Sequence, residues 1–131
     1  MIIAACGSES SESLVETGKK AVANKDYRAA SIQFKNALQK EPNSGQIRNL
    51  LGLALLDSGD AAAAAVELGK AYELGYDPSK VIPPLAQSLL LTGQYKKLAT
   101  SFSGVTPADT KAAAALKTSL AVAWDALGDG A

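Results

Sequence analysis

The sequence of 131 residues contains no histidine and only one cysteine. Without histidine the chain lacks the usual general base at neutral pH, the Ser-His and Cys-His nucleophile pairs and the commonest metal ligand. A single cysteine permits neither an internal disulfide bond nor a zinc cluster. The thirteen carboxylates are scattered, without a pair at convergent spacing. We therefore expect a protein that is not an enzyme and that has no catalytic residues, no metal site and no cofactor.

The chain also lacks an excess of charge of either sign and has few aromatic residues. Thirteen Lys and Arg balance thirteen Asp and Glu, and only 5% of residues are aromatic although 47% are hydrophobic. Lys19-Lys20 and Lys96-Lys97 are isolated pairs, which is typical of solvated helix faces. Such a distribution attracts nucleic acid only weakly, so we expect no nucleic-acid partner. The abundance of alanine favours closely packed helices over an aromatic-rich β-sandwich.

Residues of similar size recur every 34 positions along the chain. Small residues return to small positions and large apolar residues to large apolar positions, as stacked helical hairpins require. The pattern predicts an all-α solenoid of about three and a half helical hairpins, or roughly seven helices. Four sets of residues show the step: Gly18, Gly52 and Ala86; Ala30, Ala64 and Leu98; Phe34, Leu68 and Phe102; Ala37, Ala71 and Val105.

The expected organisation is a tether followed by the solenoid. Residues 1–13 contain a short apolar stretch and then a Gly/Ser/Glu segment typical of a flexible tether, and the solenoid occupies residues 14–131. No partner helix follows the last expected helix, so we expect the chain to be the N-terminal piece of a longer array. The units are three repeats over about residues 11–44, 45–78 and 79–107, and an unpaired helix over 109–127.

Capping residues and prolines mark the expected helix boundaries. Ser44 is suited to begin one helix, and Asp60 is suited to begin another. Gly59, which precedes Asp60, is suited to a left-handed turn between two helices. Pro83 and Pro84 fall in the opening turns of the first helix of the third repeat. We expect these prolines to delay or bend that helix.

The repeated residues have a characteristic order within each hairpin. Leu51-Gly52 stand early in a first helix, and Gly59 precedes a second helix. That second helix then carries a small, a large apolar and a small residue in turn, namely Ala64, Leu68 and Ala71. The order resembles the tetratricopeptide repeat (TPR) over about residues 11–127, although Arg48 stands where the repeat prefers Trp. The resemblance implies a non-catalytic scaffold that binds other proteins.

In TPR proteins the first helices of successive hairpins line a groove. The resemblance implies that an extended peptide or protein segment binds there, with Asn49 and Gln87 forming hydrogen bonds to its backbone. Leu53 and Leu91 would contact its side chains, or alternatively only pack against neighbouring turns. We expect no small-molecule substrate. The candidate groove residues are Val15, Lys19, Gln46, Asn49, Leu53, Gln87 and Leu91.

The single cysteine lies in a motif of its own. Ile3-Ala4-Ala5-Cys6 looks like the lipobox of a bacterial lipoprotein, in which the cysteine thiol receives the lipid. The alternative is a chance free thiol. Only five residues precede Cys6, and they include neither a basic segment nor a full apolar one. Either a signal peptide lies upstream of Met1 or the match is a coincidence.

Four longer segments, residues 35–42, 50–60, 67–76 and 93–97, carry a closer resemblance. In this order they resemble the N-terminal part of the TPR-repeat lipoproteins of the exosortase/PEP-CTERM system. The resemblance implies a protein of the Gram-negative cell envelope, anchored by lipid on Cys6 at the outer membrane facing the periplasm, that accompanies exopolysaccharide production and protein sorting. The lipid would be its only contact with the membrane. The alternatives are a cytoplasmic TPR adaptor, or another envelope TPR lipoprotein for pilus or outer-membrane assembly.

Overall fold

The computed structural model describes residues 9–128, which form seven α-helices and no strand. Short turns join the helices, so the all-α hairpin solenoid expected from the 34-residue step is confirmed. The motif that ends at Cys6 lies outside the described residues. The helices are α1 (Ser11–Ala23), α2 (Tyr27–Lys40), α3 (Gly45–Asp57), α4 (Ala61–Glu73), α5 (Pro78–Leu91), α6 (Tyr95–Phe102) and α7 (Thr110–Leu127).

The first helix begins within the segment that was expected to be a tether. Residues 11–13 form the first turn of α1, which begins where the first repeat was expected to begin, so these three residues of the expected tether are helical. Ser10 is the N-cap, and its hydroxyl oxygen accepts a hydrogen bond from the backbone N–H of Ser13. Glu12 places a negative charge in the first turn, where the helix dipole favours it. The helix therefore begins among polar residues, because Ser10 caps its first turn.

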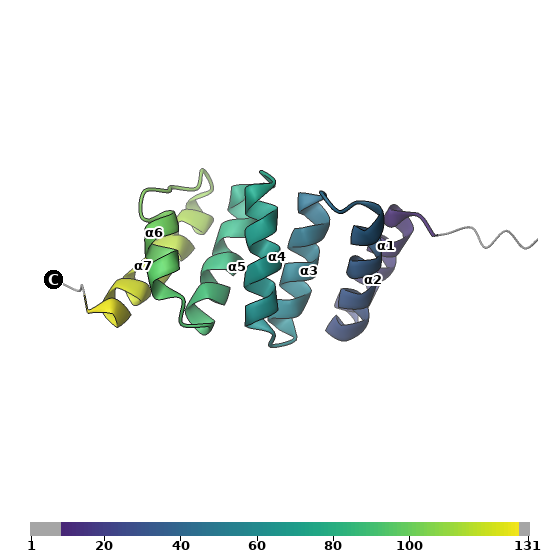
Figure 1. The fold of residues 1–131 in the computed structure, drawn as a ribbon, viewed down its shortest axis with the longest axis horizontal. Helices are drawn as coiled ribbons and strands as arrows, with labels where there is room; N and C mark the ends of the chain where they lie inside the picture. The colour runs from purple at the N-terminus through teal and green to yellow at the C-terminus, as the bar shows by residue number, and fades with distance from the viewer. Residues whose placement is uncertain (1–8, 129–131) are drawn as a thin grey trace, which may run out of the picture.

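The hairpins stand side by side along the long axis of the molecule (Figure 1). α1 packs on α2 and α3 packs on α4, while contacts of α2 with α3 and of α4 with α5 join neighbouring hairpins. α3 also contacts α5, and α7 lies against both α5 and α6. Helices α1, α3, α5 and α7 thus form one side of the molecule, which we call the odd-helix face.

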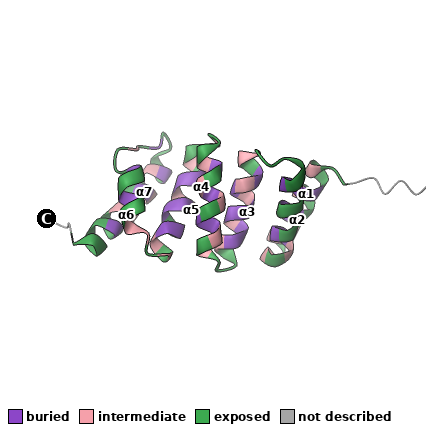
Figure 2. Cartoon of the chain, viewed as in Figure 1, coloured by how far each residue is buried: buried purple, intermediate pink, exposed green. Residues whose placement is uncertain are grey.

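Glycines let the paired helices approach closely in the first two hairpins. The buried residues form stripes along the helices (Figure 2), and Phe34 and Leu68 are fully buried within them. A Cβ atom added to Gly18 would lie 2.5 Å from Cε1 of Phe34. The same atom added to Gly52 would lie 2.5 Å from Cγ of Leu68. The two contacts are 34 residues apart, so the sequence step corresponds to a repeated packing contact.

The turns within the hairpins each contain one residue in the left-handed backbone region. These residues are Lys25 with φ 59°, Gly59 with φ 93° and Gly93 with φ 68°. The expected left-handed turn at Gly59 is therefore confirmed. The expected caps Ser44 and Asp60 are confirmed as well, because the side chain of each accepts a backbone N–H bond from the helix it precedes.

The two adjacent prolines lie inside α5 and do not delay it, contrary to expectation. The helix begins at Pro78, a favoured first position, after the capping side chain of Asp77. It continues through Pro83 and Pro84, although neither supplies an N–H group for the helix. α5 buries large apolar side chains, among them a fully buried Ile82. Their burial offsets the hydrogen bonds that the prolines cannot make.

The C-terminal part of the chain is less regular than the rest. α6 has 8 residues and no side-chain cap, whereas α2 has 14 residues and α4 has 13. α7 is the longest helix, with 18 residues. Among residues 9–128 no helix combines the length and the apolar character that crossing a membrane requires.

Candidate interaction surface

A continuous stripe of side chains runs along α3 on the odd-helix face. Gln46, Asn49, Leu53 and Leu56 follow one another at intervals of three or four residues, so they lie on the same side of the helix. One hollow lies at the N-terminal end of this stripe, against α1. A second hollow lies at its C-terminal end, against α5 and α7. We call them the N-terminal hollow and the C-terminal hollow.

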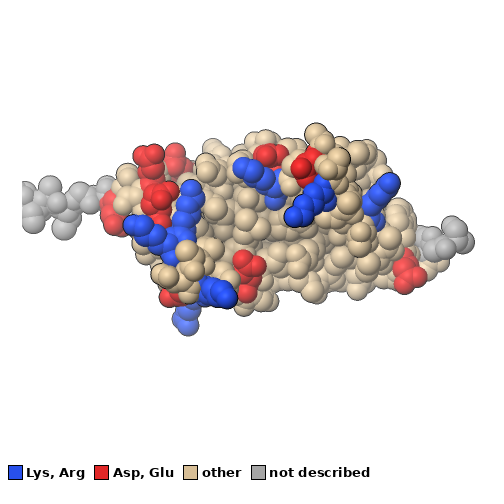
Figure 3. Space-filling view, turned by 180° about the vertical axis from the view of Figure 1, so that it is seen from behind, with Lys and Arg blue, Asp and Glu red and all other residues tan. Residues whose placement is uncertain are grey.

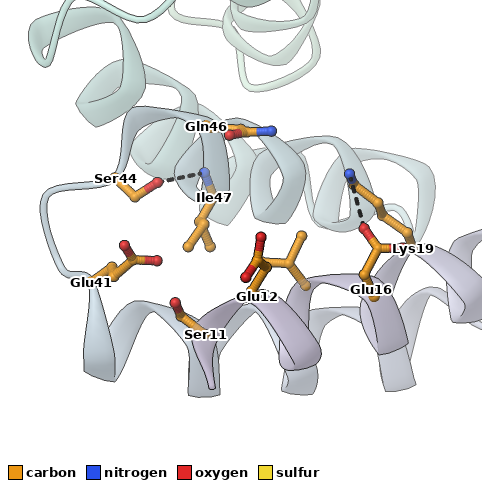
Figure 4. A pocket seen from close by; sticks show the side chains of 9 residues that line it. Ser11, Glu12, Glu16, Lys19, Glu41, Ser44, Gln46 and Ile47 are labelled. Atoms are coloured by element: carbon orange, nitrogen blue, oxygen red, sulfur yellow. Dashed lines mark hydrogen bonds and ion pairs between the residues drawn. The ribbon is translucent and has the colours of Figure 1, made fainter. Parts of the chain in front are cut away.

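The N-terminal hollow has a volume of about 470 Å³ and lies between α1 and the start of α3 (Figure 4). Val15 and Ile47 supply its apolar surface, and the other lining side chains are polar or charged. The capping bond between the Ile47 N–H and Ser44 Oγ, 3.2 Å long, fixes the start of α3 at its edge. The lining residues are Ser11, Glu12, Val15, Glu16, Lys19, Glu41, Ser44, Gln46 and Ile47.

Negative charge exceeds positive charge in the N-terminal hollow. Glu16 and Lys19 form an ion pair, with 3.5 Å between Oε1 and Nζ, and both side chains are largely exposed to solvent. Such a pair contributes little to stability. Glu12 and Glu41 belong to no ion pair within residues 9–128, and Figure 4 shows both side chains at the hollow. The hollow therefore presents two carboxylates that are not neutralised by a neighbour.

The C-terminal hollow has a volume of about 510 Å³ and is mainly apolar. Asp57 is the one charged side chain that lines it within the described part of the chain. Seen from behind, the centre of the molecule is largely uncharged, whereas charged side chains gather toward the N-terminal end and along the upper edge of the other half (Figure 3). The lining residues are Leu53, Leu56, Asp57, Pro83, Pro84, Gln87, Ala115, Thr118 and Ser119.

The adjacent prolines give the C-terminal hollow a rigid wall. Pro83 and Pro84 line it from α5, and their rings hold the backbone φ angle near one value. The Ser88 hydroxyl, which is fully buried, donates a 2.8 Å hydrogen bond to the Pro84 carbonyl oxygen. This bond supports the helix one turn after the prolines. Gln87, which stands between Pro84 and Ser88 in the sequence, also lines the hollow. Its amide is able both to donate and to accept hydrogen bonds.

The structure divides the candidate groove residues between the two hollows. Val15, Lys19 and Gln46 come together in the N-terminal hollow. Leu53 and Gln87 come together in the C-terminal hollow. Leu91, at the end of α5, lines neither hollow and is 64% exposed.

Asn49 differs from the other candidates because it is buried. Its residue is only 4% exposed, and its Oδ1 atom has no hydrogen-bond partner within the described residues. It lies on α3 between Gln46 and Leu53, but it lines neither hollow. A peptide bound in either hollow therefore cannot reach the Asn49 side chain in this geometry, contrary to the hydrogen bond that we expected.

Sequence reasoning missed several residues that line the hollows. Glu12 and Glu41 carry the charge of the N-terminal hollow, but no motif distinguishes them from other surface carboxylates. Pro83 and Pro84 were expected only to delay or bend a helix. The contribution of α7, through Ala115 and neighbouring residues, depends on its packing against α5. The 34-residue pattern contains no signal for that packing.

Arg48, which departs from the TPR pattern, forms a partly buried cluster of polar contacts. Its Nη1 donates to Oε2 of Glu67 at 2.7 Å, and its Nη2 donates to the Pro42 carbonyl oxygen at 2.8 Å. Lys70 also lies 3.5 Å from Oε1 of Glu67. The side chains of Arg48 and Glu67 are 18% and 16% exposed. The cluster joins α3, α4 and the turn before α3, and we assign it a structural role.

The chain offers no metal centre in the part that the structure describes, since no three His, Cys, Asp or Glu residues there are grouped to hold an ion. No protein-family model matches the chain, and no curated protein matches it. The odd-helix face, with its two hollows, is therefore the candidate interaction surface.

Proposed function

We propose that this chain is a non-catalytic protein–protein interaction scaffold of the TPR type that binds an extended peptide segment on its odd-helix face. The observation that carries the proposal is the pair of hollows along a single stripe of α3. Each is large enough for one or two side chains, and helices rather than loops form most of their walls. A surface with separate pockets along one line suits an extended ligand better than a compact one.

Two observations support the TPR type. The contacts of Gly18 with Phe34 and of Gly52 with Leu68 recur at the interval of 34 residues that TPR hairpins have. The order of small and large residues within the second hairpin is also that of the repeat. A repeat of this kind buries its apolar face by stacking on its neighbours, which leaves the other faces free for partners.

We further propose that the protein is a lipid-anchored member of the exosortase/PEP-CTERM system in the cell envelope, acylated on Cys6. Support comes from the Ile3-Ala4-Ala5-Cys6 motif and from the four segments that resemble the lipoproteins of this system. Acyl chains on the cysteine would contribute about 0.8 kcal/mol per buried methylene group to membrane anchoring. The solenoid would then face the periplasm from the outer membrane if a signal peptide precedes Met1, and would otherwise be cytoplasmic.

Selection from a displayed library of random peptides tests the binding function. We expect peptides that bind the chain and lose about tenfold or more in affinity on Leu53→Ser, since that change removes apolar surface from the C-terminal hollow. Leu91→Ser is the matched control, because Leu91 lines neither hollow. Equal losses in the two variants, or no selectable peptide, would reject this surface. Circular dichroism checks that both variants remain folded.

Mass spectrometry of the protein produced in a Gram-negative host with its own upstream sequence tests the anchor. We expect fatty acid on Cys6 of the mature protein and its loss, together with membrane association, in Cys6→Ser. If the mature protein carries no fatty acid on Cys6 and is found outside the membrane fraction, the proposed anchor is wrong. That result leaves the peptide-binding function to its own test.

A further inference from the structure

The two hollows have opposite chemical character, which points to the composition of the bound peptide. Resting on the function proposed above, we infer that the odd-helix face recognises an extended peptide with a basic residue and an apolar residue about four positions apart. The basic side chain occupies the N-terminal hollow and the apolar side chain occupies the C-terminal hollow.

The charge of the N-terminal hollow favours a cation. Glu16 is paired with Lys19, whereas Glu12 and Glu41 have no ion-pair partner in residues 9–128. Figure 4 shows these two side chains approaching the hollow from α1 and from the end of α2. Val15 is partly exposed in the hollow and offers apolar contact to the methylene stem of a lysine or arginine, whereas Ile47 is almost fully buried. An acidic peptide would meet repulsion at the same place.

The surface of the C-terminal hollow favours an apolar side chain. Leu53, Leu56, Pro83 and Pro84 supply apolar walls from α3 and α5, and Ala115 supplies another from α7. Burial of a leucine or phenylalanine side chain there removes apolar area from water on both partners. The small side chains contributed by α7 leave room for the ligand. The amide of Gln87, in the same hollow, is placed to bond with the peptide backbone.

The distance between the hollows sets the spacing of the two recognised residues. Gln46 and Leu53 are seven residues apart on α3, or about 10 Å along the axis at about 1.5 Å per residue. The hollows lie on opposite flanks of α3, and the width of this helix with its side chains adds a sideways offset of about 10 Å. The diagonal is then about 14 Å, which about four residues of extended chain span at about 3.3 Å each.

The test uses displayed peptide pools in which two positions, four apart, are fixed and the others are random. One pool fixes Arg and Leu in either order, and matched pools replace Arg with Gln or with Glu. We expect enrichment from the Arg pool. The best binder, measured by fluorescence polarisation, should lose about tenfold in affinity when its Arg becomes Gln and more when it becomes Glu. Its affinity should also fall with added salt more steeply than that of the Gln version.

Variants of the protein connect this preference to the N-terminal hollow. Glu12→Gln combined with Glu41→Gln should abolish the preference for Arg over Gln, because it removes both unpaired carboxylates. Glu73→Gln is the matched control, since Glu73 is an exposed carboxylate at the end of α4, outside both hollows. These side chains are exposed, so the variants are expected to fold normally.

Two results would overturn the inference, and they differ in what they leave standing. Peptides that bind equally with Arg, Gln or Glu, yet still depend on Leu53, would refute the basic residue while retaining the scaffold. A preference for Arg that survives in the double glutamine variant would place the cation elsewhere on the chain. If the fully random library yields binders but none of these pools does, the inference fails while the proposed function stands; if the random library also yields none, the proposed function fails as well.

Discussion

The first two hairpins and the third share the 34-residue step, but the two helices of each hairpin pack together in different ways. In the first two, Gly18 and Gly52 each face a large side chain of the partner helix, and no room remains for a Cβ atom. In the third, Ala86 takes the place of glycine, and the partner helix α6 has only 8 residues. α7 then packs on α5 as well as on α6. Close helix approach therefore depends on glycine, and where it is absent a further helix covers the apolar surface.

This difference extends to the interaction surface. The N-terminal hollow is built by the first two hairpins alone, from α1, α3 and the turn between α2 and α3. The C-terminal hollow needs α7, which contributes Ala115, Thr118 and Ser119 opposite Leu53. One hollow thus follows from the regular repeat and the other from the departure at the third unit. The charged and apolar ends of the surface have separate structural origins.

The largest expected effect is that of adding a methyl group at one of the two tightest glycine contacts. We expect Gly52→Ala to lower the free energy of unfolding by about 2–3 kcal/mol, because the new Cβ would lie 2.5 Å from Cγ of Leu68 and force α3 away from α4. The change is destabilising even though alanine is the better helix former by about 1 kcal/mol. Urea denaturation measures the difference.

Two variants serve as controls for the glycine contact. Gly69→Ala places a methyl group on α4 that meets nothing within 4 Å beyond its own stretch of helix, so it should stabilise the protein by up to about 1 kcal/mol. Ala86→Gly puts glycine at the equivalent position of the third hairpin and should cost about 1 kcal/mol. If Gly52→Ala stabilised the protein as much as Gly69→Ala, the proposed distinction between the first two hairpins and the third would be wrong.

The Arg48 cluster provides a second, smaller test of how the hairpins differ. The positions 34 residues before and after Arg48 are Leu14 and Ile82, both buried and apolar. Glu67→Ala should cost about 2 kcal/mol, since it leaves the partly buried Arg48 without its carboxylate. The double change Arg48→Leu with Glu67→Gln should be close to neutral, because it gives the second hairpin the apolar residue of its neighbours.

Thermal or urea unfolding of the two variants distinguishes a structural cluster from a functional one. Both should bind a selected peptide as the unchanged chain does, because neither Arg48 nor Glu67 lines the two hollows of the odd-helix face. A double variant as unstable as Glu67→Ala would mean that Arg48 makes a contact that a leucine cannot replace, such as its bond to the Pro42 carbonyl.

The repeating part of the fold could be predicted because its causes are local. The glycine and alanine positions, the cap at Ser44 and the left-handed turn at Gly59 each follow from one residue and its neighbours in sequence. The start of α5 could not be predicted in this way. Whether a helix tolerates Pro83 and Pro84 depends on how much apolar surface its other residues bury, which is a property of the packed molecule.

The candidate surface was predictable only in part for the same reason. Counting along the repeats selected Gln46, Leu53 and Gln87, which do line the hollows. It also selected Asn49, whose side chain is covered by neighbouring helices, and Leu91, which lies beyond the hollows. Periodicity assigns a residue to a face of a helix, but whether that residue is buried or exposed depends on the helices packed against that face.

The smallest expected effect concerns the turn of the first hairpin. Lys25 has a φ of 59°, in a region that favours glycine and that Gly59 and Gly93 occupy in the next two hairpins. We expect Lys25→Gly to raise the free energy of unfolding by about 1 kcal/mol, since it relieves this strain at some cost in chain entropy. Gly59→Ala should lower it by a similar amount because it introduces the same strain into the second hairpin. Urea denaturation should therefore show changes of opposite sign in the free energy of unfolding of the two variants. Changes of the same sign would indicate that the left-handed residue does not have the same energetic role in the two turns.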